Sequence, residues 1–519
     1  MRDDGPERLE RGRLLIELAL VALLFAGLSL SFGIGLADNG DYTRAMGWLT
    51  SGPATIEPNW PAQGSEAWLR RFFAFWIPYW KLDWPLDPGV LSSTAVLWFP
   101  GAVLNWLFYS RQVLYLPILS LVPRACLLLL YVAVLRWSGW RAPGRAAHWA
   151  ATIGVGVPLA FLFMAVDYVR FFNTFYRDTG TIVFLLAFLV SLAMLDATRH
   201  PRTALLLSAL SLTLLATAKV TNVYWPVLAF PFLLLARGGR RRVAAVSGVL
   251  LLSGTLALLA FSRGELPNIR DYAAYSSLYT GLLAFSSRPA EHLTRLGLQE
   301  TTDFVGKNCY LPATSRWLDS HPKRLSHRMT LDVLLHEPSA FLGEVYFAAR
   351  AMQDTAPRGG ERAVGDPTPA TRRSLHQLWC LLKTRTFPRG GALFATLGVF
   401  AAVFVLGLRA SLPLRPLSLL GLLATVGTPV EMSVAVLGGG TPDMARHLLI
   451  ANLLFDLAVI AFGATCVLRV VGLVRGPCDD PPEGAPVLLQ ERRGLHGGIA
   501  QGPLDVGQVL TQPVAHQRA

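Results

Sequence analysis

Long apolar stretches separated by short polar segments fill most of this chain. The first covers residues 14–36 and directly follows a charged segment, residues 1–13. About twenty apolar residues in a helix are enough to cross a hydrocarbon core of about 30 Å. The predicted spans are residues 14–36, 113–135, 149–166, 181–195, 204–218, 223–236, 243–261, 392–408, 417–437 and 448–471. The pattern predicts an all-α, polytopic integral membrane protein with about ten transmembrane helices.

One further apolar stretch, residues 93–109, is short and is interrupted by Pro100 and Asn105. It either spans the membrane or enters it and returns on the same side. If it does not span, one side of the membrane receives only short loops that are basic and almost without carboxylates. Those loops carry Arg2, Arg8, Arg11, Arg13, Arg136, Arg141, Arg145, Arg199, Arg202, Arg237, Arg240, Arg241, Arg242, Arg409, Arg415, Arg469 and Arg475. Cytoplasmic loops show this bias, so residues 93–109 are predicted to be re-entrant and both termini cytoplasmic.

This topology divides the chain into four parts. Residues 1–262 form an N-terminal transmembrane module whose first extracytoplasmic loop is residues 37–111. Residues 263–390 form a large extracytoplasmic hydrophilic region, and residues 391–475 hold the C-terminal transmembrane helices. Residues 476–519 are rich in Pro, Gly and Gln without an apolar period, which predicts a disordered cytoplasmic tail.

Composition supports the membrane assignment and excludes several other classes. Of the 519 residues, 52% are hydrophobic and 16% charged, against about 25% charged in soluble domains. The net charge of +13 comes from arginines beside apolar runs, which argues against nucleic-acid binding. The first apolar run is longer than that of a signal peptide and has no clear cleavage site, so an uncleaved span is predicted. Cys309 and Cys380 are read as free thiols, with a disulfide as the alternative.

Polar motifs gather on the predicted extracytoplasmic side, and the first follows the first span. It reads ADNGDYTR over residues 37–44 and contains Asp38, Asp41 and Arg44. Two carboxylates three residues apart face the same way on a helix, which favours a site for a phosphate-bearing lipid. A polar turn that only caps a helix is the alternative. Further along the loop, residues 68–80 mix basic and aromatic side chains, which favours a helix in the membrane interface.

The second motif, DYVRFFNTFYRD over residues 167–178, lies between two predicted spans. Its phenylalanines are typical of interfacial anchors, whereas Asn173, Tyr176, Arg177 and Asp178 are candidate site residues. The third motif, AKVTN, places Lys219 at the outer end of a very apolar helix. That lysine either extends to the interface without a further role or pairs with a phosphate, and both readings stay open.

The fourth motif comprises Glu431 and the segment GGGTPDMARH, residues 438–447, with Asp443, Arg446 and His447. Cations at a helix N-terminus oppose the helix dipole, so their position calls for a compensating anion. Asn452 and Asp456 follow deeper in the last span, where polar residues mark functional or packing sites. The sequence has no phosphate-binding loop, HExxH, GxSxG or DxD motif, so nothing supports a soluble nucleotide donor.

In these four motifs the chain resembles polytopic glycosyltransferases of the GT-C class, in particular bacterial glycan-biosynthesis hexose transferases of the WsfD-like kind. ADNGDYTR, FFNTFYRD, AKVTN and GGGTPDMARHLLIANLLFD carry the resemblance over residues 14–471. It implies a sugar donor linked to polyprenyl phosphate and a cell-envelope glycan or lipid-linked acceptor outside a bacterial inner membrane. Asp178 stands where the family is expected to have glutamate, and Thr174 where serine is common.

The resemblance also implies roles for individual residues. Asp41 is the expected general base, with Asp38 as its helper or as the ligand of a divalent metal, Mg²⁺ or Mn²⁺, whose requirement stays open. The expected ligands of the donor phosphate are Arg177, Lys219, Arg446 and His447, and the expected substrate-binding residues are Arg44, Asn173, Tyr176, Asp178 and Asp443.

Other functions stay open at this point. A transporter or flippase for lipid-linked intermediates should show internal repeats and polar residues near mid-membrane, and neither is evident here. A non-catalytic scaffold would usually lack the acidic pair. A glycan ligase or polymerase would rely on arginine and histidine in a large outer loop, and residues 263–389 contain His292, His321, His327 and His336.

Overall fold

The computed structural model describes residues 5–37, 49, 50, 52, 54, 76–83, 92–136, 145–197, 201–236, 240–262, 267–352, 374–410, 414–441 and 444–474. The chain divides into two units, Met1–Val471 and Gly472–Ala519. Of the second unit, only the end of the last helix is described. The candidate residues Asp38, Asp41, Arg44 and Asp443 and the predicted tail, residues 476–519, lie outside the described residues.

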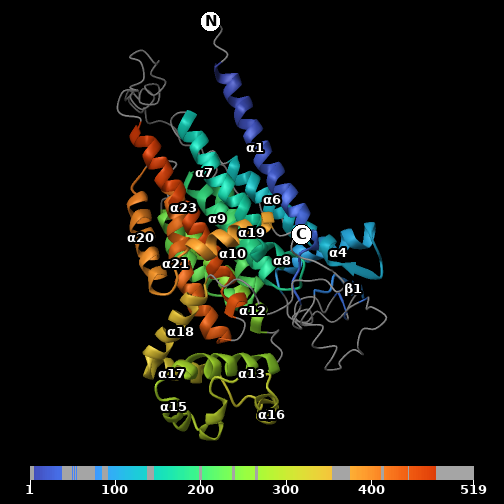
Figure 1. The fold of residues 1–519 in the computed structure, drawn as a ribbon, viewed down its shortest axis with the longest axis vertical. Helices are drawn as coiled ribbons and strands as arrows, with labels where there is room; N and C mark the ends of the chain where they lie inside the picture. The colour runs from blue at the N-terminus through green and yellow to red at the C-terminus, as the bar shows by residue number, and fades with distance from the viewer. Residues whose placement is uncertain are drawn as a thin grey trace, which may run out of the picture. The chain divides into compact units, whose positions relative to one another are not determined.

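The described part of the chain is an all-α membrane protein apart from one short sheet (Figure 1). Five segments are long and apolar enough to cross a membrane. They are formed by α1 (Gly5–Leu30) with η1 (Ser31–Gly33), α5 (Leu116–Leu119) with α6 (Leu121–Leu135), α9 (Asp178–Ala197), α21 (Leu414–Gly439) and α23 (Leu449–Val474). Two pairs of bent helices raise the number to seven if each pair crosses once. These are α7 (Arg145–Met164) with α8 (Val166–Phe172), bent by 55°, and α19 (Ser374–Thr386) with α20 (Gly391–Gly407), bent by 102°.

The described residues thus support five to seven spans, where the apolar pattern predicted about ten. The difference lies mainly in three helices, α10 (Pro201–Ala218), α11 (Trp225–Leu235) and α12 (Arg240–Ser262). Their apolar parts have at most 17 residues, which rise about 26 Å and fall short of a hydrocarbon core of about 30 Å.

Contacts between helix ends define one end of the bundle, here called the arginine end. Glu17 accepts hydrogen bonds or ion pairs from Arg13 at 2.7 Å and from Arg136 at 3.3 Å. Arg415 lies 3.5 Å from Asp196 and donates a hydrogen bond of 2.6 Å to the carbonyl of Leu235. Segments that the sequence predicted to be cytoplasmic therefore contact one another: the start of α1 contacts the end of α6, and the start of α21 contacts the ends of α9 and α11.

The opposite end, here called the motif end, is defined by contacts of the predicted outer loops. The hydroxyl of Ser92 donates to the carbonyl of Ala218 at 2.7 Å, and the hydroxyl of Thr94 to that of Arg177 at 3.4 Å. These contacts start α4 (Ala95–Phe108), and the chain leaves this helix through β2 (Val113–Tyr115), which lies beside Trp80 and Phe175 at the same end. The contacts place both ends of this helix at the motif end, which agrees with the prediction that residues 93–109 are re-entrant.

The short sheet pairs β1 (Tyr79–Lys81) with β2 in antiparallel register, with Trp80 opposite Leu114. The predicted interfacial helix over residues 68–80 is wrong for residues 76–80, which are extended, and residues 68–75 lie outside the described residues. Pro78 cannot donate a helical hydrogen bond, and its carbonyl accepts one from the backbone of Leu116 instead. Trp80 is also only 1% exposed, so it belongs to a packed core.

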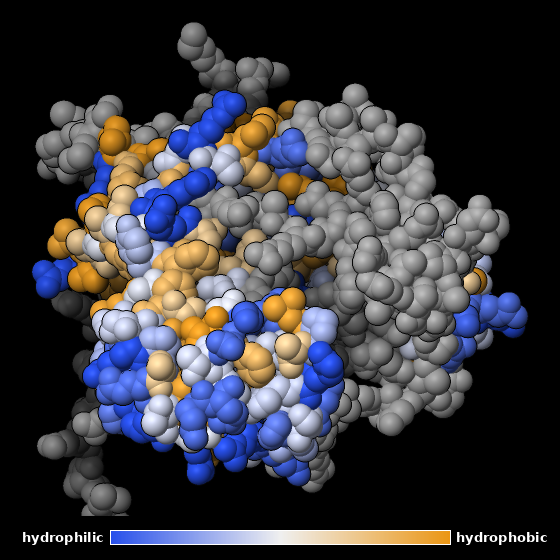
Figure 2. Space-filling model, turned by 60° about the horizontal axis from the view of Figure 1, so that its bottom comes forward, coloured by the Kyte–Doolittle hydropathy of each residue, from blue (hydrophilic) through white to orange (hydrophobic). Residues whose placement is uncertain are grey.

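The hydrophilic region forms a group of short helices at one end of the first unit (Figure 1). They are α13 (Pro267–Tyr275), the π-helix η4 (Ser276–Leu282), α14 (Leu283–Phe285), α15 (Pro289–Arg295), η5 (Gln299–Phe304), α16 (Pro312–Ser320), α17 (His327–His336) and α18 (Pro338–Ala351). Figure 2 shows that the face of this group turned to the viewer is mostly hydrophilic. That surface suits helices that lie in water beside the membrane.

The helix α19 differs from the rest of the hydrophilic region, residues 263–390, because it packs against α7 and α8 among the membrane helices. Lys383 on α19 is completely buried and lies 3.1 Å from the carboxylate of Asp456 on α23. The same carboxylate accepts hydrogen bonds from the hydroxyl of Tyr168 at 2.6 Å and the indole of Trp379 at 2.9 Å. The bundle therefore contains a buried ion pair that two further donors support.

Candidate functional site

Two buried side chains hold the end of the first span. The last backbone carbonyls of a helix have no hydrogen-bond partners within that helix. At the end of α1 and η1, such carbonyls accept hydrogen bonds from neighbouring side chains. The guanidinium of Arg124 donates to the carbonyls of Leu28 and Ser31, each at 3.1 Å. The amide of Asn173 donates to the carbonyls of Phe32 at 3.2 Å and Ile34 at 2.5 Å. The chain is thereby fixed four residues before Asp38.

The second motif also fixes the residue directly before the acidic pair. The hydroxyl of Tyr176 donates a hydrogen bond of 2.9 Å to the carbonyl of Ala37, which precedes Asp38 in the sequence. The indole of Trp76 donates to the carbonyl of Asn173 at 2.8 Å. Its ring lies against Gly35, where an added Cβ would come within 2.3 Å of the indole. Asn173 and Tyr176 therefore position the backbone from which the first motif extends.

Lys219 and Asp178, from the third and second motifs, form an ion pair. The ammonium lies 3.0 Å from Oδ1 and 3.3 Å from Oδ2 of the carboxylate. The side chain of Lys219 is 26% exposed, whereas that of Asp178 is 6% exposed. Asp178 begins α9, where the helix dipole favours a negative charge. An ammonium has three N–H donors, so Asp178 can orient Lys219 and leave a donor for a further anion.

The fourth motif meets the second at Tyr176. The guanidinium of Arg446, on α22 (Met444–His447), lies 4.9 Å from the centre of the Tyr176 ring, within the range of a cation–π interaction. The imidazole of His447 packs on Gly439, where an added Cβ would lie 2.6 Å from Nε2. Arg177 stands between Tyr176 and Asp178, and its carbonyl accepts the hydroxyl of Thr94.

Residues 173–178, here called the α8–α9 connection, thus contact the three other motifs. The sequence predicted that these motifs share one side of the membrane, but it did not predict which residues pair. It also missed Arg124 and Trp76. The signal for Arg124 was available, because a single arginine inside an apolar run marks a functional or packing position.

Glu431 lies near this group, in the membrane-spanning α21. Its side chain is 5% exposed and accepts a hydrogen bond of 3.0 Å from the indole of Trp225. Glu431 is therefore a buried acidic group on the same helix as the first glycines of the fourth motif.

The glycine turn of the fourth motif docks on the π-helix η4. Gly440 has a φ of +61°, and an added Cβ would come within 2.4 Å of the carbonyl oxygen of Ser276, so only glycine fits. The hydroxyl of Thr441 donates to the carbonyl of Thr280 at 3.0 Å. Short π-helical segments occur frequently at functional sites, and this one links the turn to the hydrophilic region.

Glu344, on α18, is buried against the irregular part of the same π-helix. Gly281 departs from helical backbone angles, and an added Cβ there would lie 2.8 Å from Oε1 of Glu344. Among the described residues, neither carboxylate oxygen of Glu344 has a hydrogen-bond partner. Burial raises the pKa of Glu344 from 4.5 to about 9, so the folded protein holds this side chain as a neutral acid at pH 7.

Glu344→Gln should make the protein more stable than wild type at neutral and mildly alkaline pH. The carboxyl group ionises near pH 4.5 when unfolded but near pH 9 when folded. Below about pH 4.5 the Glu344 carboxyl is protonated in both states and does not reduce the free energy of unfolding. As the pH rises from there to about 9, the free energy of unfolding falls by up to about 1.4 kcal/mol for each pH unit. We expect a gain on the order of 2 kcal/mol for the glutamine variant between about pH 6 and 8, measured by thermal unfolding in detergent. Glu300→Gln, at an exposed glutamate, is the matched control, and equal pH profiles for wild type and Glu344→Gln would contradict the prediction.

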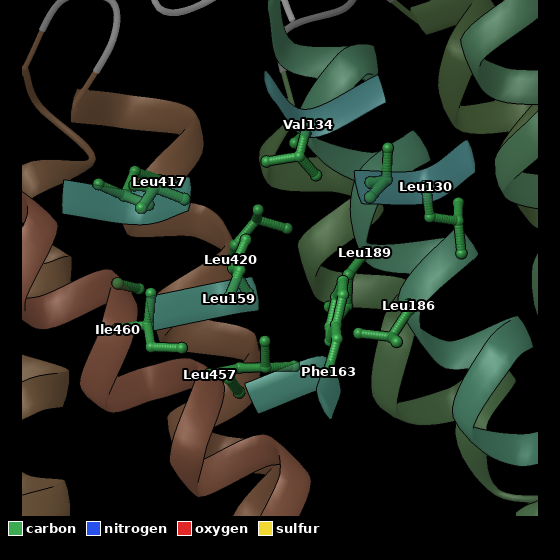
Figure 3. Close-up of a pocket in the computed structure, with 15 residues that line it drawn as sticks. Leu130, Val134, Leu159, Phe163, Leu186, Leu189, Leu417, Leu420, Leu457 and Ile460 are labelled. Carbon is green, nitrogen blue, oxygen red and sulfur yellow. The ribbon is translucent and has the colours of Figure 1, made fainter. Parts of the chain in front are cut away.

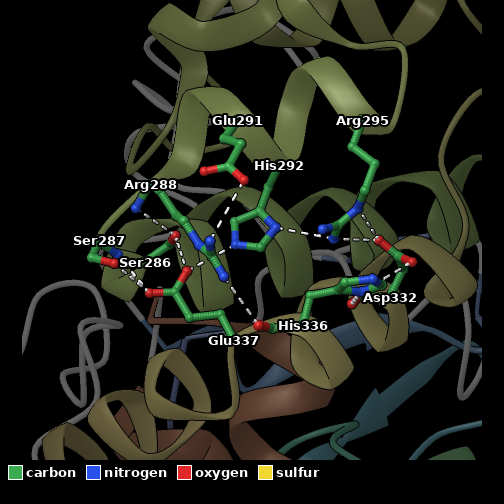
Figure 4. A network of polar contacts seen from close by, with 9 residues as sticks. All are labelled: Ser286, Ser287, Arg288, Glu291, His292, Arg295, Asp332, His336 and Glu337. Carbon is green, nitrogen blue, oxygen red and sulfur yellow. Dashed lines mark hydrogen bonds and ion pairs between the residues drawn. The ribbon is translucent and has the colours of Figure 1, made fainter.

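Two histidines of the hydrophilic region, His292 and His336, belong to a structural network (Figure 4). His292 is 1% exposed, and both of its ring nitrogens are engaged, Nε2 with Glu337 at 2.8 Å and Nδ1 with Arg295 at 3.0 Å. Arg295 continues to Asp332 at 2.6 Å. Burial opposes ionisation of Glu337, but hydrogen bonds from Ser286, Ser287 and His292 outweigh it and lower its pKa to about 2. This network ties α15 to α17 and leaves no nitrogen of His292 for a substrate.

The remaining reactive groups are possible metal ligands and thiols. The described residues contain no group of three or more His, Cys, Asp or Glu side chains that could hold a metal ion. Asp38, the predicted ligand, lies outside them, so its role stays a prediction. Cys309 is buried and Cys380 is partly buried, and both are free thiols.

Comparison with known proteins gives one match. Residues 8–474 match the model of the family described as YfdI N-terminal transmembrane domain. Neither a curated protein nor a solved structure matches the chain.

Proposed function

Because the chain belongs to the YfdI N-terminal transmembrane domain family and is a multi-pass membrane protein, we propose that it is a glycosyltransferase of the GT-C class, similar to WsfD-like hexose transferases. It transfers a sugar from a polyprenyl-phosphate-linked donor to a cell-envelope glycan or lipid-linked acceptor. The observation that carries this proposal is the convergence of four polar motifs on the α8–α9 connection. Tyr176 contacts Ala37 and Arg446, and Asp178 pairs with Lys219.

The proposed reaction needs a base and a cationic site for the leaving group. The acceptor hydroxyl oxygen forms a bond to the anomeric carbon while the bond from that carbon to the phosphate oxygen breaks. Asp41 takes the hydroxyl proton, with Asp38 as its helper. The phosphate leaves with the bonding electron pair, and oriented cations stabilise the charge that it gains. Divalent metal at Asp38 would add a further positive charge at the same phosphate.

The cations near the α8–α9 connection suit that second requirement. Lys219 is held by Asp178, and Arg446 is held over the ring of Tyr176, so both charges are oriented before a substrate arrives. A preorganised charge stabilises a developing anion without reorganisation during the reaction. Arg177 and His447 lie in the adjoining residues of the same two motifs and are the further proposed phosphate ligands.

We also propose that the three short helices cross the membrane, which gives about ten crossings in all. The chain from Lys219 to Leu235, which contains α11, joins the motif end at Asp178 to the arginine end at Arg415. A helix can cross a locally thinned bilayer at a modest energetic cost. With the arginine end cytoplasmic, the motif end then faces the extracytoplasmic side of a bacterial inner membrane.

Lys219→Ala should lower hexose transfer by about 10²-fold, the effect of removing one preorganised donor from a developing anion. The assay follows radiolabelled hexose from a polyprenyl-phosphate donor into glycan in purified membranes. Lys307→Ala, at an exposed lysine of the hydrophilic region, is the matched control. Equal rates for the two variants would contradict the role of Lys219. Absence of transfer by folded wild-type protein would instead favour a transporter or flippase, or a ligase or polymerase of lipid-linked glycans.

A further inference from the structure

A cavity of about 100 Å³ lies among five membrane helices (Figure 3). Fifteen side chains line it, and all of them are hydrocarbon. The helices α6, α7, α9, α21 and α23 each contribute, for example through Leu130, Phe163, Leu186, Leu420 and Ile460. The cavity thus has no group that could bind a polar ligand.

The cavity lies toward the arginine end, away from the candidate site. Its lining residue Ala193 is three residues before Asp196 on α9, and Leu417 is two residues after Arg415 on α21. Leu186, the lining residue of α9 nearest to Asp178 at the motif end, lies eight residues after it, a rise of about 12 Å. Any occupant of the cavity is therefore separate from the groups proposed for sugar transfer.

Physical chemistry restricts what can fill such a space. One water needs about 10–15 Å³ of this kind of volume, so the size would admit several. Water also needs polar partners, and apolar cavities stay dry and take apolar guests. Left empty, the lining side chains would lose their dispersion contacts. Inside a bilayer the abundant apolar guest is a hydrocarbon chain.

A cationic side chain lies at the same end of the bundle as the cavity. It favours a lipid whose head group is anionic. Arg415 contacts Asp196 and the carbonyl of Leu235. Its Nε is buried and has no hydrogen-bond partner among the described residues. A guanidinium has five N–H donors and binds phosphate well. Arg13 and Arg136 share the single carboxylate of Glu17, which leaves a net positive charge at this end.

We propose that this cavity holds one acyl chain of an anionic phospholipid from the leaflet at the arginine end, with its phosphate beside Arg415. The lipid fills the space between the five helices and neutralises part of the basic surface. The phospholipid is thereby a structural partner of the bundle, bound independently of donor and acceptor. This proposal rests on the membrane helices and does not require the proposed transfer reaction.

The proposal is tested by substituting larger side chains for two small ones that line the cavity. Ala424→Leu/Ala461→Leu adds side-chain volume at two lining positions, whereas Val426→Leu/Val467→Leu changes exposed positions on the same two helices. Each full-length protein is purified in detergent, incubated with palmitoyl-oleoyl phosphatidylglycerol and examined by native mass spectrometry. We expect wild type and the control to retain one phosphatidylglycerol per chain and the filled variant to retain at least tenfold less. Phosphatidylglycerol should also raise the melting temperature of the first two proteins only.

Three results would overturn the proposal. The filled variant could retain the same amount of phosphatidylglycerol as wild type. Phosphatidylcholine could be retained as well as phosphatidylglycerol, which would remove the role of the arginines. The filled variant could be more stable than wild type in lipid-free detergent while neither protein binds lipid, which would show that the cavity is a dry packing void.

Discussion

Asp41→Asn is expected to abolish hexose transfer while leaving the protein folded and inserted in the membrane. The amide keeps the size of the carboxylate but cannot accept the proton of the acceptor hydroxyl, and a general base contributes about 10²–10⁴-fold to rate. Asp41 lies outside the described residues, but the chain that leads to it is held by Tyr176 and Asn173. The measurement is transfer of radiolabelled hexose in purified membranes at equal protein level.

The neighbouring acid Asp38 provides the control for Asp41→Asn. Asp38→Asn, three residues before Asp41, should reduce transfer less if Asp38 is only a helper, and should change the metal dependence if it is a ligand. Both variants should melt at the wild-type temperature in detergent. Full transfer by Asp41→Asn would exclude Asp41 as the base, and loss of transfer in Asp38→Asn alone would assign the base to Asp38.

Lys383→Met should destabilise the protein by about 3–5 kcal/mol, the usual effect of removing one partner of a buried ion pair. Lys383 and Asp456 are both completely buried, with 3.1 Å between ammonium and carboxylate. Without the lysine, the carboxylate keeps only the neutral donors Tyr168 and Trp379. The expected result is a lower melting temperature in detergent and a smaller yield of folded protein from membranes.

A double variant separates loss of the ion pair from loss of packing. In Lys383→Met/Asp456→Asn the amide oxygen can still accept from Tyr168 and Trp379, and no buried charge remains without a counter-charge. Most of the stability should return. Purely additive effects of the two single substitutions would show that the charges are not coupled. Lys307→Met, at an exposed position, controls for the change of residue type.

The sequence predicted the membrane helices because the length of an apolar run is a local property. The runs that became α1, α9, α21 and α23 can be recognised without knowledge of their neighbours. The helix α19 could not, because its charged residues are typical of a surface segment. Lys383 is neutralised by Asp456, 73 residues later in the chain, and the sequence contains no local sign of that pairing.

The candidate site likewise has a part that the sequence predicts and a part that it does not. Because loops alternate between the two sides of a membrane, the order of the spans alone predicted that the four motifs share one side. The pairs Lys219–Asp178 and Arg446–Tyr176 depend on how helices rotate and pack, which hydropathy does not specify. The extended pairing of residues 79–81 likewise depends on β2, a strand more than thirty residues further along the chain.

The two contacts of Tyr176 have a consequence for biosynthesis. Its hydroxyl bonds to Ala37 near the N-terminus, and its ring faces Arg446 near the last helix. Membrane proteins are inserted as they are translated, N-terminal segments first. A nascent chain that has delivered Ala37 and Tyr176 to the bilayer still lacks Arg446 until more than 400 residues have been synthesised. A chain that stops before Arg446 would therefore occupy the membrane without the full set of proposed phosphate ligands, and the proposed transfer could not begin until Arg446 has been synthesised.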